Sequence, residues 1–397
     1  MDLLDIVLVL VALAYAAAGY RRGLVAGCVS LAGFVGGAVV GVWALPWVTG
    51  LVARGSAAAT VLAILTVLVP GMVGHELAGR LALRLRSELD REGRGPLRVA
   101  DGIGGAAANA AAVLIVAWVA ASVLGAAPSQ TLTTQIRNSA LLGAVQERMP
   151  QTTPAWFSRA TSALTEAGFP QVFNPFENES TAQVAEPSGD SVTADAKRAA
   201  QRSTVKIEGA SGSEGREGSG FVYAPGHVMT NAHVVAGIDS PSVRVGGVGR
   251  SYGARVVLFD PDRDVAVLYV PGLRAPVLRF DGGARRGDTA VVAGYPQDGN
   301  LNLQAATVAN RVRATGQNIY NDRSVTREIY AIRSKVLPGN SGGPLLTTKG
   351  RVFGVVFARS TSDTETGYAL TAQEVEDDAS RGARATTAVD TGELATS

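Results

Sequence analysis

Gly339-Asn340-Ser341-Gly342-Gly343-Pro344 is the stretch that decides the fold of the C-terminal half of this chain. Two upstream segments complete it: Thr230-Asn231-Ala232-His233-Val234-Val235 and Asp264-Val265-Ala266-Val267-Leu268. A nucleophilic serine needs a base to take its proton, and the base needs an anion to hold its tautomer and stabilise its cation. The three segments supply one residue of each kind, in the contexts expected of a single catalytic apparatus.

Glycines on both sides of Ser341 allow the backbone to turn sharply at that residue. Such a turn can direct the amides of Gly339 and Ser341 at a developing oxyanion. The anion is predicted to be Asp264, because an apolar strand follows it directly. Asp260 and Asp262 lie close by in the sequence and are the alternatives. His227, between Gly and Val, is predicted to be a turn residue.

The chain from residue 203 onward consists of short β runs separated by Gly, Pro and Asp. The runs cover residues 205–207, 220–223, 243–245, 254–258, 265–270, 290–293, 329–332 and 352–357. Many short strands at this spacing predict an all-β barrel or sandwich. The capping box Thr371-Ala372-Gln373-Glu374 predicts a last helix over residues 372–380. The polar tail that follows, residues 382–397, is expected to be disordered.

The three motifs in this order closely resemble the trypsin-like serine proteases, particularly the bacterial high-temperature-requirement branch, over about residues 200–381. The resemblance implies a double β-barrel endopeptidase that acts on proteins or peptides. In it Ser341 is the nucleophile, His233 is the general base and later the acid, and Asp264 orients the imidazolium. The amides of Gly339 and Ser341 form the oxyanion hole. An esterase with the same triad is an alternative, although α/β-hydrolases place the serine first.

The same resemblance places four residues around the primary specificity pocket. Aligned on Ser341, Lys335 falls at the base of the pocket, and Phe357, Ala358 and Arg359 fall on its wall strand. A lysine at the base would favour an acidic residue before the scissile bond. The alternative is that the long Lys335 side chain points outward.

The first 127 residues are mostly Ala, Val, Leu and Gly. Four stretches, about residues 3–20, 24–47, 57–75 and 103–124, are long and apolar enough to cross a bilayer as helices. The first begins Met1-Asp2-Leu3-Leu4-Asp5 without a basic region, so it is predicted to be a retained span and not a signal peptide. A four-helix transmembrane domain is therefore expected over residues 1–127.

Arginine placement predicts the orientation of these spans. Arg21 and Arg22 follow the first stretch, and six further arginines follow the third: Arg80, Arg84, Arg86, Arg91, Arg94 and Arg98. Both connections are expected to be cytoplasmic, which places the two termini and the hydrolase outside the cytoplasm. Asp5, His75 and Glu76 are expected at span ends, where water and headgroups solvate them. Frequent Gly, as at Gly33, Gly36, Gly37 and Gly41, favours close helix packing in a compact bundle or an oligomer.

The segments Leu3-Leu4-Asp5-Ile6-Val7 and Gly19-Tyr20-Arg21-Arg22-Gly23-Leu24 resemble the colicin V production protein family of four-span membrane proteins. Joined to a trypsin-like domain, they resemble the actinobacterial, notably mycobacterial, membrane-anchored serine proteases linked to acid and oxidative stress resistance. This resemblance implies a periplasmic endopeptidase that cleaves envelope proteins at the plasma membrane. The alternative is a membrane transporter or scaffold whose protease-like domain binds without catalysis.

Residues 128–200 are predicted to link the two halves. Two short helices are expected within residues 131–148 and 155–167, followed by a flexible tether at 177–192 that is a candidate site of self-cleavage. Cys28 is the only cysteine, which excludes an internal disulfide, and no pair among the three histidines has zinc-ligand spacing. We expect no metal and no cofactor. A net charge of +2 indicates no nucleic-acid partner.

Overall fold

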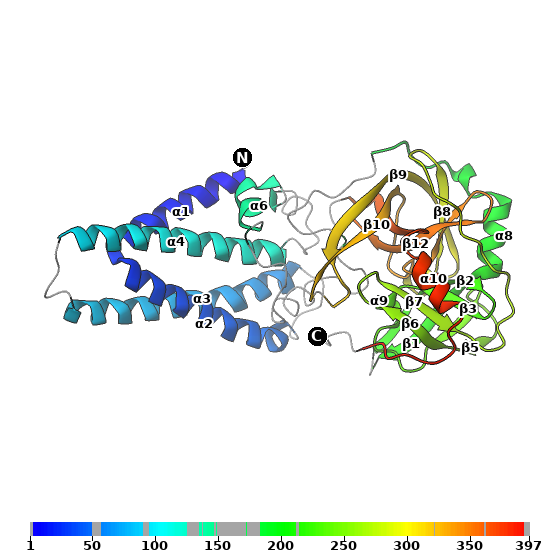
Figure 1. Cartoon of the computed structure of the whole chain (residues 1–397), viewed down its shortest axis with the longest axis horizontal. Helices are drawn as coiled ribbons and strands as arrows, with labels where there is room; N and C mark the ends of the chain where they lie inside the picture. The colour runs from blue at the N-terminus through cyan, green and yellow to red at the C-terminus, as the bar shows by residue number, and fades with distance from the viewer. Residues whose placement is uncertain are drawn as a thin grey trace.

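The computed structural model describes residues 3–49, 57–89, 95–124, 135–136, 138–146, 148, 172, 183–211, 214–320, 322–360 and 363–392. A helical half and a β half lie at opposite ends of its longest axis (Figure 1). The predicted helix at 155–167 lies outside the described residues. Within 131–148 the structure forms the short helix α6, Ala140–Gln146.

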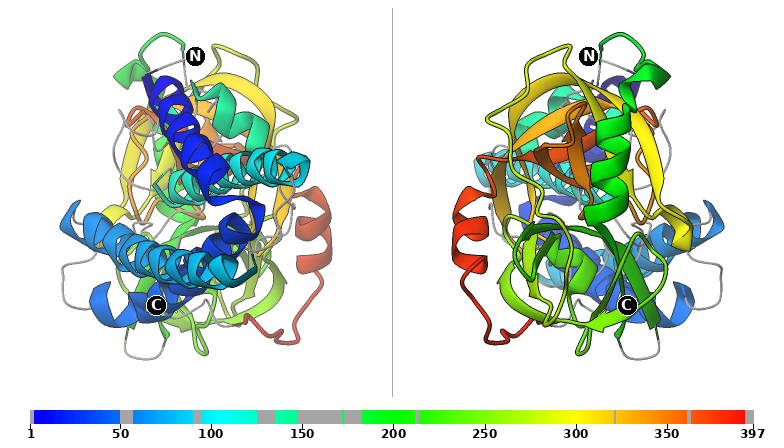
Figure 2. Two further views of the ribbon diagram at one scale, coloured as in Figure 1. Left: turned by 90° about the vertical axis from the view of Figure 1, so that its left-hand side faces the viewer. Right: turned by 90° about the vertical axis from the view of Figure 1, so that its right-hand side faces the viewer.

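The helical half contains four long helices: α1 (Leu3–Arg22), α2 (Leu24–Thr49), α3 (Ala57–Leu89) and α4 (Gly95–Leu124). The left view of Figure 2 shows that α1 lies against α4 and α2 lies against α3. Among the described residues, three helices contain stretches long and apolar enough to cross a membrane: Leu4–Arg22, Leu24–Gly41 and Val99–Trp118. The remaining predicted span falls in α3.

Glycines bring α2 and α3 into backbone contact. A Cβ atom built on Gly33 would lie 2.3 Å from the carbonyl oxygen of Gly74, and one on Gly37 would lie 2.0 Å from that of Pro70. Gly36, in contrast, has no heavy atom within 4 Å of its hypothetical Cβ. Small residues therefore determine how closely these two helices approach, as expected for packing in lipid.

Asp5 differs from its expected solvated position at a span end, because its side chain is fully buried. Its carboxylate accepts hydrogen bonds from Ser139 Oγ at 2.6 Å and from the amides of Ala140 and Leu141 at 3.2 Å each. These amides begin α6, where a helix leaves its N–H groups without internal acceptors and favours an anion. Asp5 thus links the N-terminus of α6 to α1 through hydrogen bonds.

The β half contains two antiparallel units. A seven-stranded sheet has the order β5-β4-β1-β2-β3-β7-β6, and a closed barrel has the order β10-β13-β12-β11-β8-β9. The bounds of the sheet strands are β1 Thr204–Ser211, β2 Glu214–Ala224, β3 His227–Thr230, β4 Ser242–Val245, β5 Ser251–Gly253, β6 Arg255–Asp260 and β7 Val265–Tyr269. Those of the barrel are β8 Thr289–Gly294, β9 Asn302–Gln317, β10 Ser324–Arg333, β11 Pro344–Thr347, β12 Val352–Arg359 and β13 Thr366–Thr371. The predicted all-β class is confirmed. One unit is a closed barrel, whereas the hydrogen bonds described for the other unit form a sheet, so the double barrel stays a prediction.

Three large clusters of buried apolar side chains lie in the described β half. One cluster, which includes Ile207 and Leu268, lies within the first unit. A second, which includes Phe353 and Val356 of β12, lies within the barrel. A third joins the two units and takes Phe357 from the same strand. Because β12 is buried on both faces, its sequence is an almost continuous apolar run.

The predicted capping box forms only in part, and the last helix begins later than expected. Thr371 Oγ1 accepts the Glu374 amide at 3.0 Å, but the Glu374 carboxylate accepts the Glu328 amide at 2.9 Å. Helix α10 therefore spans Glu376–Gly382 and not residues 372–380. Residues 383–392, which were expected to be disordered, contact the β half: the Val389 amide donates to the Val256 carbonyl at 2.9 Å.

Residues 183–203 pack on the β half, although the sequence predicts a linker up to residue 200. Helix α8 (Ala194–Ser203) contributes Ala196 and Ala200 to the core between the two units. Ahead of it, the carbonyl of Gln183 accepts a hydrogen bond from Arg286 at 2.6 Å, and that of Val184 accepts one from Arg333 at 2.7 Å. The second half of the predicted tether is therefore docked on the barrel.

Candidate active site

His233 lies on α9 (Ala232–Val235), a single helical turn that follows strand β3. Its Nδ1 atom is 2.7 Å from Asp264 Oδ2, and its backbone amide donates to Asp264 Oδ1 at 2.9 Å. Both carboxylate oxygens of Asp264 are thus engaged by one residue. This double contact holds the imidazole with Nδ1 facing the anion and Nε2 facing the other way.

Asp264 ends the loop between β6 and β7 and is fully buried. Its φ of 63° is in the left-handed region, which costs a non-glycine residue about 1–3 kcal/mol. Aspartate tolerates this region better than most residues. The Asn231 side-chain amide donates to the Asp264 carbonyl at 2.8 Å and helps to hold this backbone.

The two alternative carboxylates have other partners. Asp260 accepts the backbone amides of residues 262 and 263 at 3.0 and 2.9 Å. Asp262 accepts hydrogen bonds from Asn318 at 3.1 Å and from Arg323 at 3.1 Å. The structure therefore brings Asp264, among the three candidates, to the histidine.

Ser341 lies in the loop between β10 and β11, and its side chain is buried. Within the described part of the chain, neither Ser341 Oγ nor His233 Nε2 has a hydrogen-bond partner, although both atoms are inaccessible to solvent. A buried polar atom without a partner costs about 1–3 kcal/mol. Catalytic hydrogen bonds are often long without substrate and shorten only in the complex. Ser341 is therefore buried and His233 is partly buried, and no hydrogen bond joins Oγ to Nε2 in the described structure.

The amide of Gly339 is oriented by its neighbours. The carbonyl of Pro338 accepts the Gln297 amide at 3.0 Å. Since the C=O and N–H of a trans peptide point in opposite directions, the Gly339 N–H is directed away from Gln297. The described residues offer no acceptor to the amides of Gly339 or Ser341. Gly339 has φ 94°, and a Cβ there would lie 2.4 Å from the Tyr295 carbonyl oxygen, so glycine is required.

Ser219, on β2, ties the serine loop to the first sheet and was not predicted from the sequence. Its amide donates to the Ser341 carbonyl at 2.9 Å, and its hydroxyl donates to the Gly339 carbonyl at 2.6 Å. The same hydroxyl accepts the Tyr295 amide at 2.9 Å. Within Gly218-Ser219-Gly220 the sequence contains only a strand signal, so nothing in it could have identified this role.

The four residues predicted around the specificity pocket differ in burial. The Lys335 side chain is exposed, which matches the alternative that it points outward. Phe357 and Ala358 are fully buried in the core between the two β units, and Arg359 is half-buried. None of the four contacts Ser341 through a hydrogen bond in the described structure. The pocket assignment stays a prediction.

No described group of three or more His, Cys, Asp or Glu residues could hold a metal ion. Arg327 is a buried arginine that interacts electrostatically with Asp264. Burial lowers the pKa of this guanidinium, while the charges of Asp264 and Asp262 oppose that shift. Arginine stays protonated in proteins, so Arg327 is a cation that partly balances the buried aspartate.

Fold and site together define a trypsin-like serine endopeptidase joined to apolar helices that suit a membrane. Residues 218–355 match the family described as trypsin-like peptidase domain, and residues 4–150 match the colicin V production protein family. The serine protease Rv3671c of Mycobacterium tuberculosis is 36% identical over 382 residues, 94% of each chain. The chain belongs to the same family as this mycobacterial serine protease.

Further relatives agree with this assignment. The crystal structure of the active form of the Rv3671c protease has 40% sequence identity and a TM-score of 0.53, and covers 57% of this chain and 100% of its own. A probable periplasmic serine endoprotease, DegP-like, from Chlamydia pneumoniae is 33% identical over 145 residues, which are 36% of this chain and 28% of that protein. The predicted class of enzyme is thereby confirmed.

Proposed function

We propose that this protein is a multi-pass membrane serine endopeptidase that cleaves proteins of the cell envelope. The observation that carries the proposal is the His233–Asp264 pair, which lies on one β unit, together with a serine loop on the other. That loop presents two amides without acceptors in the described structure. A binding module without catalysis would need neither the buried pair nor the strained aspartate.

The proposed reaction starts with attack of Ser341 Oγ on the carbonyl carbon of the scissile bond, while His233 Nε2 takes the hydroxyl proton. Asp264 keeps the second proton on Nδ1 and stabilises the imidazolium. The amides of Gly339 and Ser341 donate to the oxyanion. His233 then protonates the leaving amine, which leaves an acyl-enzyme on Ser341. Water, deprotonated by His233, releases the acid and restores the hydroxyl.

We also propose that the helical half crosses the membrane four times and that the peptidase lies outside the cytoplasm. Arginines support this orientation, because Arg21 and Arg22 are the last residues of α1, and this helix runs away from the β half (Figure 1). The similarity to DegP-like periplasmic proteases is in agreement. A scan of cysteine accessibility from outside intact cells tests this orientation. Labelling of a cysteine introduced between α1 and α2 would contradict it.

A fluorophosphonate probe tests the chemistry. The wild-type protein in detergent micelles should be labelled and should cleave an unfolded protein substrate, whereas Ser341→Ala should do neither. Absence of labelling in folded wild-type protein would favour a transporter or scaffold with a binding domain. Labelling with hydrolysis of esters but never of peptide bonds would favour an esterase.

The physiological role that we propose is resistance to acid and oxidative stress, as the resemblance to the mycobacterial membrane-anchored proteases implies. Cys28 is the only cysteine, so regulation by an internal disulfide is not available to this chain. Comparison of N-termini in envelope proteins from wild-type and Ser341→Ala strains, with and without acid or peroxide, would identify the substrates. Identical N-termini in both strains would contradict the role.

A further inference from the structure

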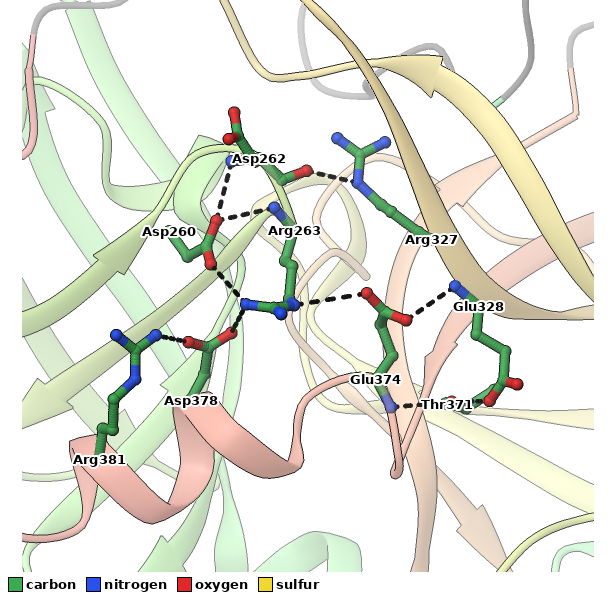
Figure 3. Close-up of polar contacts among 9 residues, drawn as sticks. All are labelled: Asp260, Asp262, Arg263, Arg327, Glu328, Thr371, Glu374, Asp378 and Arg381. Carbon is green, nitrogen blue, oxygen red and sulfur yellow. Dashed lines mark hydrogen bonds and ion pairs between the residues drawn. The ribbon is translucent and has the colours of Figure 1, made fainter.

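The loop that carries Asp264 is held by the C-terminal segment of the chain (Figure 3). The residue before the aspartate, Arg263, contacts three carboxylates. Its guanidinium lies 3.0 Å from Asp260, 3.5 Å from Glu374 and 3.7 Å from Asp378. Two of these anions come from residues more than a hundred positions later in the chain, on the turn after β13 and on α10.

These two anions are themselves fixed. Glu374 accepts the backbone amide of Glu328, on β10 of the barrel, at 2.9 Å, and its own amide is bonded to Thr371. Asp378 is fully buried and is bonded on its other side by Arg381. The contact from Arg263 to Glu374 therefore reaches the barrel, whereas Asp378 lies on α10, which packs on β6 and β7 beside the loop.

The barrel contacts the same loop a second time. Arg327 of β10 donates from Nε to the Asp262 carbonyl at 2.7 Å and from its terminal nitrogen to the Gln317 carbonyl at 3.0 Å. Of the two arginines, Arg263 is the one directly joined to Asp264. The loop between β6 and β7 belongs to the first unit, so these bonds join the acidic member of the triad to the unit that carries the serine.

We propose that Arg263 is a positioning residue, which uses Glu374 and Asp378 to keep Asp264 at hydrogen-bonding distance from His233. The inference rests on the proposed catalytic function. Asp264 has an unfavourable φ of 63° and makes both of its histidine contacts in that conformation. Strained residues persist only when the surrounding structure over-determines them. Arg263 supplies that constraint at the adjacent residue.

Charge explains why a neutral replacement would fail. Without the guanidinium, the carboxylates of Asp260, Glu374 and Asp378 would lose the cation that all three contact, although Asp378 would keep its contact with Arg381. Burial raises the pKa of Asp378, and the Asp260 charge adds to that rise, whereas Arg263 and Arg381 counteract it. Like charges in a partly buried cluster separate or take up protons. Either response moves the loop.

The test compares three variants of the full-length protein in detergent micelles. Arg263→Gln removes the charge, Arg263→Lys keeps it without the planar fork, and Arg198→Gln removes an arginine whose ion pair with Asp195 on α8 is exposed and lies outside the cluster. A displacement of about 1 Å can cost roughly a hundredfold in rate. We expect kcat to fall about ten- to a hundredfold in Arg263→Gln with KM unchanged, and to recover in large part in Arg263→Lys. Arg198→Gln should stay within about threefold of wild type.

The pH dependence of kcat/KM separates positioning from stability. A displaced Asp264 stabilises the His233 imidazolium less, so the acidic limb of the profile should move to lower pH in Arg263→Gln and not in Arg198→Gln. A lower Tm with an unchanged profile and unchanged kcat below that temperature would overturn the inference. Were Arg263→Gln not to fold, Asp378→Asn should reproduce the loss of kcat in part, and wild-type kcat there would overturn the inference equally.

The fluorophosphonate reaction distinguishes this inference from the function on which it rests. Failure of wild type to react would end the proposed function itself. Reaction of wild type and Arg263→Gln at the same rate would leave the peptidase in place and end only the positioning role.

Discussion

Asp264→Asn is the substitution that examines the site most directly. Asparagine has nearly the shape of aspartate and also tolerates a positive φ, so the backbone at 63° should persist. The change replaces the Oδ2 acceptor, which lies 2.7 Å from His233 Nδ1, with an NH₂ group. Alanine at this position would confuse the chemistry with backbone strain.

The magnitude follows from the two contacts. With asparagine at this position, the neutral imidazole would accept from the new donor at Nδ1 and carry its proton on Nε2, the wrong tautomer for a base. Restoring the productive tautomer loses the hydrogen bond from Nδ1 to a charged carboxylate, which is worth about 1.5–3 kcal/mol. It also leaves the Nδ1–H and the asparagine NH₂ facing each other as buried donors without an acceptor, which costs about 1–3 kcal/mol more. The sum of about 3–6 kcal/mol corresponds to a loss of about 10² to 10⁴ in kcat. The same exchange in serine proteases costs about 10⁴.

The assay is the turnover of a fluorogenic peptide by full-length protein in micelles, with Tm measured in parallel. Asp262→Asn is the matched control, because that carboxylate binds Asn318 and Arg323 and does not contact the histidine. We expect it to keep kcat within about threefold. If Asp264→Asn retained kcat within about tenfold of wild type while staying folded, Asp264 would not be the group that orients the base.

Three further substitutions address the rest of the molecule. Gly339→Ala places a Cβ 2.4 Å from the Tyr295 carbonyl and must rotate the oxyanion peptide, so kcat should fall about 10²- to 10³-fold; an unchanged kcat would refute that role. Gly33→Leu should separate α2 from α3 and lower Tm in detergent, whereas Gly36→Leu, with free space at its Cβ, should not, and equal effects would contradict glycine-mediated packing. Burial alone would raise the pKa of Glu328, but hydrogen bonds from an arginine and a threonine lower it below its ordinary value of 4.5. That stabilisation is present above pH 4.5 and is lost as the pH falls through the lowered pKa. The free energy of unfolding measured in urea should therefore be lower for Glu328→Gln than for wild type at neutral pH and equal to that of wild type in acid.

Local chemistry made much of this protein predictable. The apolar stretches predicted the long helices, because a span must be hydrophobic along its whole length, and the order of motifs predicted the enzyme class. The aspartate could be chosen from three because an apolar strand follows Asp264 and not Asp260 or Asp262. The limits of α10 were predicted less well, because the Glu374 carboxylate accepts an amide of the barrel and does not cap the predicted helix.

Contacts between distant segments were not accessible in this way. Asp5 appeared to be a solvated span end, yet it caps a helix that begins at Ala140. The tail after Gly382 has the polar composition of a disordered segment, but its backbone is bonded to the first sheet. Composition describes what a segment can bury on its own, and in both cases the partner comes from elsewhere in the chain.

By itself the amino-acid sequence determined which residue types carry the chemistry, because a nucleophile, a base and an anion each need a particular functional group. Only the tertiary structure decided which contacts hold these segments: Ser219 bonds to the carbonyls of Gly339 and Ser341, Gln297 bonds to the carbonyl of Pro338, and Glu374 and Asp378 lie against Arg263. Hydrogen bonds of this kind are directed contacts of about 3 Å between residues far apart in the chain. Such contacts leave no periodicity in the sequence, and they exist only once the two β units are packed together.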